Sequence, residues 1–154
     1  MKKAFLYMVL CLLTVCSCRP SGKHFSATVE IHEGPVLALK QTNKSAQIDL
    51  VHHDAKPYIL KSVMLLLTGT ENLSDITKVS VFQNNKEIGS NVLTIGKKRY
   101  NIPIDLNLRV NEDSLSLDIH LTLKDTIALS NKIRIEEIRI NTSEKNPISI
   151  AAME

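Results

Sequence analysis

The chain has 154 residues, of which 44% are hydrophobic and 23% charged, with only five glycines and five prolines. This composition excludes a disordered or collagen-like chain, and the length leaves room for one ordinary domain. Residues 1–17 contain two lysines and no acid, so their removal lowers the formal net charge from +3 to +1. Such a balance argues against a nucleic-acid partner, which usually meets a strongly basic face.

The N-terminal segment has the pattern of a lipoprotein signal peptide covering residues 1–17. Lys2 and Lys3 form a positive start, and Ala4–Val15 is an apolar run too short to span a bilayer permanently. The run ends in a sequence that resembles a lipobox, in which a small residue directly precedes a cysteine that receives a diacylglycerol. Because Ser17 is small, Cys18 is the expected lipidation site. We therefore expect a bacterial lipoprotein that meets the membrane only through its lipid anchor, with a plain secretory signal as the alternative.

All three cysteines, Cys11, Cys16 and Cys18, lie in or at the end of this segment. Cys16 follows the branched Val15 and is the second choice for lipidation. The mature domain then has no thiol other than the lipidated one, which excludes a disulfide, a redox pair and a cysteine metal site. No cofactor is expected.

The mature chain is predicted to be built from β-strands. Arg19–Ser26 contains turn formers without apolar periodicity, so residues 18–26 are expected to form a lipidated tether. From Ala27 onward, short runs rich in Val, Ile, Leu and Thr alternate with a period of two between turn residues. The expected strands are Ala27–Ile31, Val36–Lys40, Ala46–His52, Tyr58–Leu67, Thr77–Phe82, Tyr100–Leu108, Ser114–Leu123 and Lys132–Ile140. About eight strands without a long amphipathic helix predict an all-β, two-sheet β-sandwich over residues 27–145, with a jelly roll among its possible topologies, followed by a tail, 146–154.

Several local features of these runs carry more specific expectations. Glu136-Glu137 adds one residue to the alternation of Lys132–Ile140, which predicts a β-bulge. Tyr58–Leu67 is almost continuously apolar and is expected to be a central strand buried on both faces. Pro103 lacks a ladder donor and favours an edge strand or a bulge, and Gln83–Lys86 is a hairpin turn because Asn tolerates positive φ.

The sequence offers no complete catalytic site. A serine in G-x-S-x-G, a mature cysteine near a histidine and a G-x-x-x-x-G-K loop are all absent. His52-His53-Asp54 has the residue types of a metal site, but adjacent strand residues point to opposite faces, so no metal site is predicted. His24, His32 and His120 are interpreted as ordinary polar side chains, and the acidic pairs as solvated strand faces.

The basic turn Gly96–Tyr100 is the candidate ligand-binding site. Lys97, Lys98 and Arg99 stand together beside Tyr100, so cationic donors lie next to an aromatic ring. An acidic ligand would suit this combination, because the forked donors of an arginine match a carboxylate. A solvated hairpin tip accounts for the same residues and remains the alternative.

Three motifs in the mature chain match those of one known domain family in their order and spacing. Thr68–Phe82 contains T-G-T-E-N-L-S-D-I-T-K-V, which is similar to the family segment G-T-x-N-L-x-D-I-x-x-V that leads into a strand. Tyr100–Leu108, Asp113–Leu117 and Leu129–Ile133 are similar to the later strands of that domain. The chain thus resembles the N-terminal domain of bacterial exo-α-sialidases, and the resemblance covers about residues 27 to 145.

This resemblance implies a non-catalytic carbohydrate-binding or accessory module. In the family, the domain is a β-sandwich that precedes a six-bladed propeller carrying the arginine triad and the Asp boxes that cleave sialic acids. The present chain contains no tryptophan and none of those boxes, so no enzymatic activity is expected. The implied partners are sialylated or mucin-type glycans, with Arg99 on a sialic-acid carboxylate, and a sialidase catalytic domain supplied elsewhere.

Two alternatives to a glycan-binding module remain open from the sequence. The chain could be a structural docking domain, or the leading fragment of a split or truncated sialidase that binds no sugar. As the resemblance implies for glycan-foraging bacteria, the expected location is the outer membrane. No acidic export run follows Cys18, so the sequence leaves open whether the protein faces the periplasm or the cell surface.

Overall fold

The structure is a computed structural model, and it describes residues 24–31, 42–54, 56–69, 73–94, 96–124, 133–144 and 147–151. Within these ranges nine strands and one short 3-10 helix follow one another along the chain. They are β1 (Phe25–Ile31), β2 (Thr42–His52), β3 (Tyr58–Gly69), η1 (Leu73–Asp75), β4 (Ile76–Gln83), β5 (Lys86–Val92), β6 (Arg99–Val110), β7 (Ser114–Leu123), β8 (Ile133–Thr142) and β9 (Ile148–Ala151).

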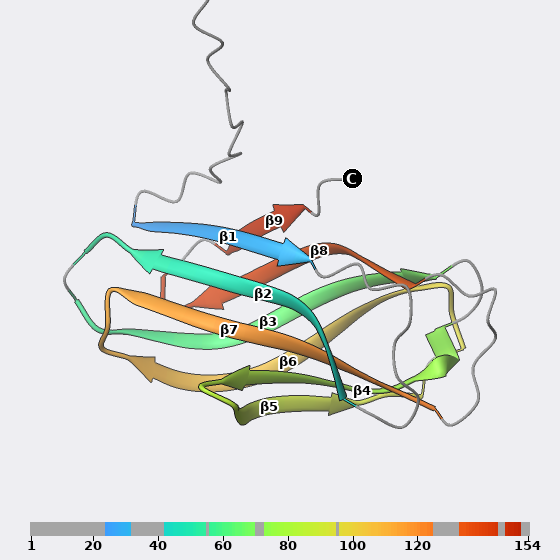
Figure 1. Cartoon of the computed structure of the whole chain (residues 1–154). Coiled ribbons are helices and arrows are strands. Elements are labelled where there is room, and N and C mark those ends of the chain that lie inside the picture. Colours follow the sequence, from blue (N-terminus) through green and yellow to red (C-terminus); the bar gives the residue numbers. More distant parts are fainter. Residues whose placement is uncertain are drawn as a thin grey trace, which may run out of the picture.

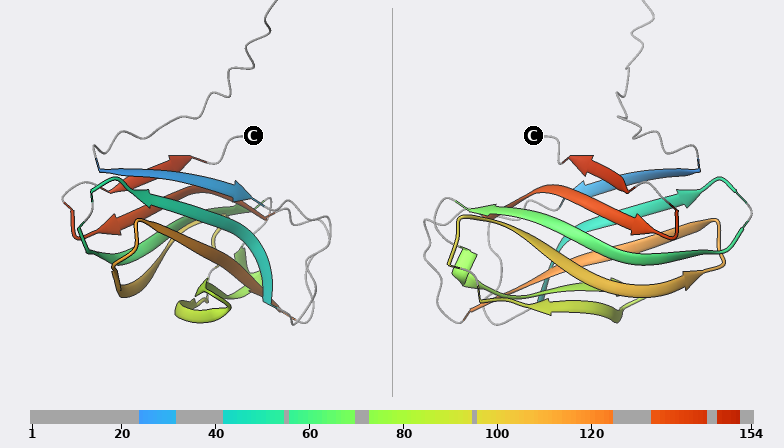
Figure 2. Two further views of the ribbon diagram at one scale, coloured as in Figure 1. Left: turned by 60° about the vertical axis from the view of Figure 1, so that its left-hand side comes forward. Right: turned by 180° about the vertical axis from the view of Figure 1, so that it is seen from behind.

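The strands form two sheets that face each other as layers (Figures 1 and 2). One sheet has the order β1-β2-β7-β4-β5 and the other the order β6-β3-β8-β9, with antiparallel pairing throughout. This arrangement confirms the predicted all-β, two-sheet β-sandwich. None of the described residues belongs to a helix long and apolar enough to cross a membrane.

The core lies between the two sheets and is filled by alternate residues of each strand. In β7, Leu115, Leu117, Ile119, Leu121 and Leu123 all point inward and are at most 4% exposed, while the residues between them face outward. Such alternation follows from the pleat, which sends successive side chains to opposite faces. Fully buried leucines and isoleucines each stabilise the fold substantially, since truncation to alanine typically costs about 2–5 kcal/mol.

The strand order selects one topology from those that the sequence left open, which included a jelly roll. The neighbour relations β1-β2-β7 and β6-β3-β8-β9 resemble the A-B-E and C′-C-F-G strands of an immunoglobulin-type Greek key. The hairpin β4–β5 lies in the sequence between β3 and β6 and extends the first sheet beyond β7. Each sheet thus has two edge strands, and β6 is one of them.

Three local predictions are confirmed by the backbone. Asn84 and Asn85 have φ values of 50° and 63° and form the turn between β4 and β5. Leu66 pairs with Glu137 and Leu67 with Ile135, so Glu136 is the extra residue of a bulge in β8. Pro103 lies in the edge strand β6, although the bulge of β6 falls at Asn107, which has a φ of 50°.

The structure also departs from the expected elements. β3 lies inside its sheet, but it is buried on one face only, because Met64 and Leu66 are half-buried on the outer face. The strands β5 and β9 were not predicted, since both are short and β5 has only two aliphatic residues. The strand β9 occupies part of the predicted tail, where Ile148 is 4% exposed in the core.

The N-terminal boundary of the domain differs slightly from the prediction, and several predicted features lie outside the described residues. The first described strand begins at Phe25, inside the predicted tether, because Phe25 packs into the core at 5% exposure. The signal peptide 1–17, the lipidation site Cys18, most of the tether and the strand Val36–Lys40 lie outside the described residues.

Candidate functional site

The basic segment Gly96–Tyr100 connects the two sheets, so it is not the tip of a hairpin. The chain leaves β5 in the first sheet and enters β6 in the second. The Leu73 N–H donates to the carbonyl of Lys97 at 2.7 Å, and the Gly69 N–H donates to the carbonyl of Lys98 at 2.8 Å. These bonds hold the basic segment against η1 and the end of β3, which fixes where its side chains start.

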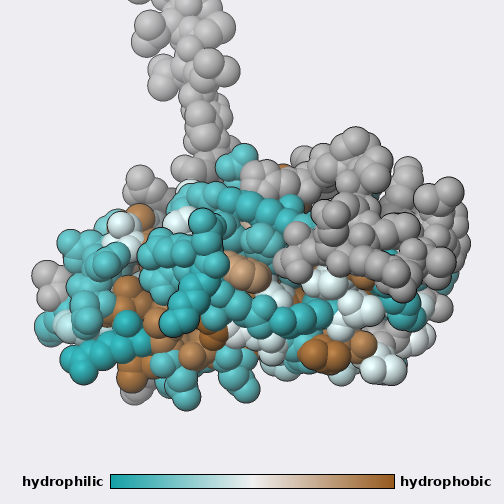
Figure 3. Space-filling view, turned by 60° about the horizontal axis from the view of Figure 1, so that its bottom comes forward, coloured by the Kyte–Doolittle hydropathy of each residue, from teal (hydrophilic) through white to brown (hydrophobic). Residues whose placement is uncertain are grey.

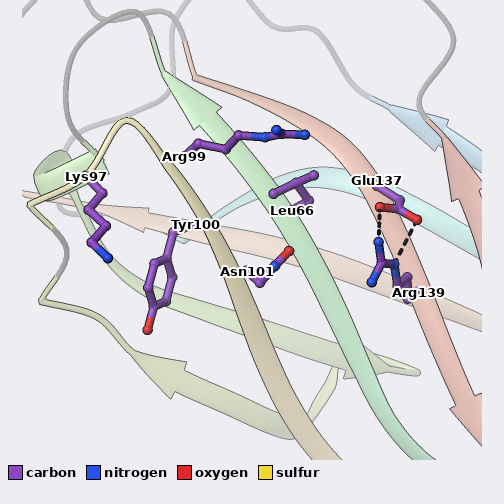
Figure 4. A pocket seen from close by; sticks show the side chains of 7 residues that line it. All are labelled: Leu66, Lys97, Arg99, Tyr100, Asn101, Glu137 and Arg139. Atoms are coloured by element: carbon purple, nitrogen blue, oxygen red, sulfur yellow. Dashed lines mark hydrogen bonds and ion pairs between the residues drawn. The ribbon is translucent and has the colours of Figure 1, made fainter.

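An open groove of about 570 Å³ lies beside this segment, on the four-stranded sheet (Figure 4). Its lining comes from the 96–98 connection and from three neighbouring strands, β6, β3 and β8. The lining residues are Leu66, Lys97, Arg99, Tyr100, Asn101, Glu137 and Arg139. Three of the four residues predicted from the basic turn therefore lie at one groove, and Lys98 does not line it.

The alternation of β6 divides these residues between its two sides. Arg99 pairs with Thr68 and Asn101 with Leu66, so both lie on the outer face of the sheet. Figure 4 shows both side chains on the side of β6 that faces Leu66 and Glu137, whereas Lys97 and Tyr100 extend away on the other side. Tyr100 is 41% exposed and borders the groove without covering its floor. Because adjacent residues of a strand point to opposite sides, Arg99 and Tyr100 do not face one ligand together on the outer face of the sheet.

Two arginine–glutamate pairs lie at the groove. Arg99 Nη2 lies 2.7 Å from Glu136 Oε2, and Arg139 donates through Nε and Nη2 to the two oxygens of Glu137, each at 2.8 Å. Ser149 of β9 also donates its hydroxyl to Glu137. The bidentate pair of Arg139 and Glu137 holds both side chains in one orientation.

The same contacts set the ionisation of the groove. Hydrogen bonds from Arg139 and Ser149 lower the pKa of Glu137 to about 2, and its carboxylate raises the pKa of Arg139. Glu137 is therefore an acceptor at any physiological pH. The floor offers a carboxylate, a guanidinium and the amide of Asn101, which suit hydroxyl and carboxylate groups of a polar ligand.

Sequence reasoning did not select Leu66, Asn101 or Arg139, and it treated Glu137 as part of a solvated acidic pair. Strand alternation alone would have placed Asn101 beside Arg99. The contribution of β8 required the sheet order, because β3 lies between β6 and β8. The bulge at Glu136 then sets which residues of β8 face the groove.

Comparison with known proteins adds no family to this description. A scan against protein-family models found no match to the chain, and a search of curated proteins found no similar sequence. The fold and the groove define the class as a two-sheet antiparallel β-sandwich with a polar groove on the outer face of one sheet.

Proposed function

We propose that this protein is a non-catalytic carbohydrate-binding module, anchored to the outer membrane by a lipid on Cys18, in a sialidase-type glycan-foraging system. The observation that carries the proposal is the groove on the four-stranded sheet. It is lined by Arg99, Asn101, Glu137 and Arg139 and bordered by Lys97 and Tyr100 on the other side of β6. The sialidase-like motifs of the sequence support the same class of ligand.

The charges and donors of the groove favour an acidic sugar. Three lining residues are cationic and one is anionic, so the field at the groove attracts a carboxylate. Arg99 holds Glu136 through a partly exposed ion pair, with side-chain exposures of 65% and 41%. An exposed pair of this kind is weak, so a ligand carboxylate can replace Glu136 at low cost.

A binding role fits the ionisation of the groove better than glycoside hydrolysis does. Hydrolysis needs a carboxylic acid whose pKa is raised so that it can protonate the leaving group. Glu137 has the opposite environment, because its pKa of about 2 keeps it ionised. Its fixed oxygens are suited to accept hydrogen bonds from sugar hydroxyls.

A docking role finds less support on the one face that Figure 3 shows. On the face drawn in Figure 3, hydrophobic residues lie in patches that hydrophilic side chains interrupt. An apolar docking interface would present a larger continuous apolar area. The docking or fragment role is therefore an outcome of the test below.

Calorimetric titration with a panel of sialylated and desialylated mucin glycans tests the proposal. We expect saturable binding to the sialylated glycans, weakened about 10- to 100-fold in Arg99→Ala and Arg139→Ala, because each loses a hydrogen bond to a charged group. Asn101→Ala and Tyr100→Ala report the two sides of β6 separately. Lys86→Ala, at the far turn between β4 and β5, is the matched control and should bind like the wild type.

Which variants lose affinity for the glycan distinguishes the possible binding positions. Losses in Arg99→Ala, Asn101→Ala and Arg139→Ala place the glycan on the outer face of the sheet. A loss confined to Tyr100→Ala places it at the edge of β6. Absence of binding to every glycan rejects the carbohydrate-binding role and leaves the docking or sialidase-fragment role.

A further inference from the structure

Three metal-ligating side chains meet at the end of the sandwich where β2 ends, β3 begins and β8 ends, on the left in Figure 1. His52, Asp54 and Glu144 each offer one ligand atom, and these atoms all lie within 4.8 Å of one another. His52 closes β2 in the five-stranded sheet, and Glu144 follows β8 in the four-stranded sheet. The cluster therefore spans the two layers of the fold.

The sequence argued against a metal here because His52 and His53 are adjacent on a strand. Their alternation is as expected: His53 is exposed and its Nε2 lies 3.1 Å from Ser26 Oγ, while His52 points inward. Besides His52 and Asp54, the third metal-binding side chain is that of Glu144, which is distant in the sequence. Only the pairing of β3 with β8, in which Leu60 is opposite Thr142, brings Glu144 to this end.

The buried imidazole of His52 is the second observation that points to a ligand. His52 is 4% exposed and stacked on Phe25 with ring centroids 4.4 Å apart, and its Nε2 has no hydrogen-bond partner among the residues that the structure describes. A buried polar atom without a partner destabilises the folded state, because it has lost its hydrogen bonds to water. A ring nitrogen of this buried imidazole lies within 4.8 Å of a carboxylate oxygen of Asp54 and of Glu144, so one cation can lie between the three groups.

The backbone holds all three residues in place. The His52 N–H donates to the carbonyl of Asp113 at 2.7 Å, and the Lys56 N–H closes the turn by donating to the carbonyl of Asp54 at 2.7 Å. The Ser143 N–H donates to the carbonyl of Ile59 at 2.7 Å, directly before Glu144. The side chains can therefore converge without moving the strands.

The charges and spacing of the cluster suit a divalent transition metal. Among the described residues, no lysine or arginine pairs with Asp54 or Glu144, and His24 contacts the Asp54 carboxylate through Nδ1. Around a tetrahedral ion with bonds of about 2.0–2.1 Å, ligand atoms lie roughly 3.4 Å apart, so movements of roughly 1 Å complete the set. Glu144 is exposed and on a long side chain, and it can supply that movement.

We propose that His52, Asp54 and Glu144 bind a divalent transition-metal ion of the zinc class, with His24 orienting Asp54 from outside. One imidazole and two carboxylates match the borderline ligand preference of zinc, whereas calcium prefers oxygen ligands alone. The bound ion would join the end of β2 to the end of β8 and so stabilise the contact between the sheets. This site is independent of the glycan groove.

Zinc titration of the full chain tests the proposal. The protein is made by cell-free synthesis without a histidine tag, kept in mild detergent, and carries Cys11→Ser, Cys16→Ser and Cys18→Ser so that no thiol competes for zinc. Isothermal calorimetry with ZnCl₂ should show one saturable site, and zinc should raise the melting temperature because it binds the folded state. Cobalt(II) should give the visible absorption of a low-coordinate nitrogen–oxygen site.

The variants separate ligand loss from loss of fold. Asp54→Asn and Glu144→Gln remove ligands near the surface and should weaken zinc binding by on the order of 100-fold, with the circular dichroism spectrum unchanged. His53→Gln and Glu136→Gln are the matched controls and should bind zinc like the parent chain. The proposal is overturned if the parent chain binds no zinc saturably, if calcium binds in preference to zinc, or if both ligand variants retain the parent affinity.

Discussion

Gly89 of β5 lies directly against the backbone of Asp105 in β6, since a Cβ atom built on Gly89 would stand 2.9 Å from the Asp105 carbonyl oxygen. The same atom would lie 3.1 Å from Cγ2 of Ile104. Beside this contact, Asn91 donates its amide to the carbonyl of Pro103 at 2.8 Å. The edge strands β5 and β6 belong to different sheets, so this glycine allows one side of the sandwich to close.

Gly89→Ala is accordingly expected to destabilise the fold. The added methyl group meets a backbone carbonyl that cannot turn away, and overpacking of this kind costs about 1–3 kcal/mol. Gly96→Ala is the matched control, because a Cβ built there meets nothing within 4 Å. Urea denaturation measures both. Equal stability of the two variants would show that the β5–β6 seam relaxes freely.

The turn between β4 and β5 carries a second prediction. Asn84 and Asn85 both have positive φ, as in the type I′ turns that match the twist of a hairpin. Asn85→Ala should lower the free energy of unfolding by about 1–2 kcal/mol, because alanine is strained in the left-handed region. Asn85→Gly should retain or raise it. A thermal melt in which alanine and glycine behave alike would contradict the assignment of strain to this position.

The sequence predicted the features that depend on neighbouring residues. The asparagines of the β4–β5 turn, the extra residue at Glu136 and the inward leucines of β7 follow from local φ preferences and from the period of two. The strands β5 and β9 were not predicted, because edge strands can form with few apolar residues. Their place is decided by pairing with β4 and β8, which local pattern does not encode.

The candidate groove was predictable only in part, for a related reason. The basic turn identified Lys97, Arg99 and Tyr100. Residues that follow one another along a strand point to alternate sides, however, so these three do not all face the groove floor. Glu137 and Arg139 reach the groove through β3, which lies between β6 and β8. In the same way, Glu144 meets His52 only because the sandwich brings the ends of two sheets together.

We expect His120 to make the stability of the fold depend on pH. Its ring packs on Phe82 with centroids 4.5 Å apart, and burial lowers the pKa of His120 below its ordinary value of 6.5, opposed by Asp118 and assisted by Lys44. The folded state therefore favours the neutral imidazole. The stability contributed by this preference is fully present above about pH 6.5 and is lost as the pH falls from there through the lower folded pKa.

His120→Gln should flatten this dependence. We expect the melting temperature of the wild type to fall more than that of the variant between about pH 7.5 and 5.5, because only the wild type has this imidazole to protonate. Melts followed by circular dichroism at several pH values in this range measure the difference. Parallel pH profiles would mean that another group causes the decline.

Glu137 has the same sign of linkage as His120, but it acts at lower pH. Its pKa is lowered from 4.5 to about 2 by hydrogen bonds from Arg139 and Ser149, so the folded state favours the carboxylate. The stability that the carboxylate contributes is present above about pH 4.5 and is lost as the pH falls through about 2. Glu137→Gln should therefore melt below the wild type at neutral pH, and the gap should close between about pH 4.5 and 2. Glu112→Gln, in the exposed turn between β6 and β7, serves as the control and should leave the neutral-pH melt unchanged. A gap that persists undiminished at pH 2 would show that the amide disturbs packing, because most of the stability that the carboxylate contributes is already lost at that pH.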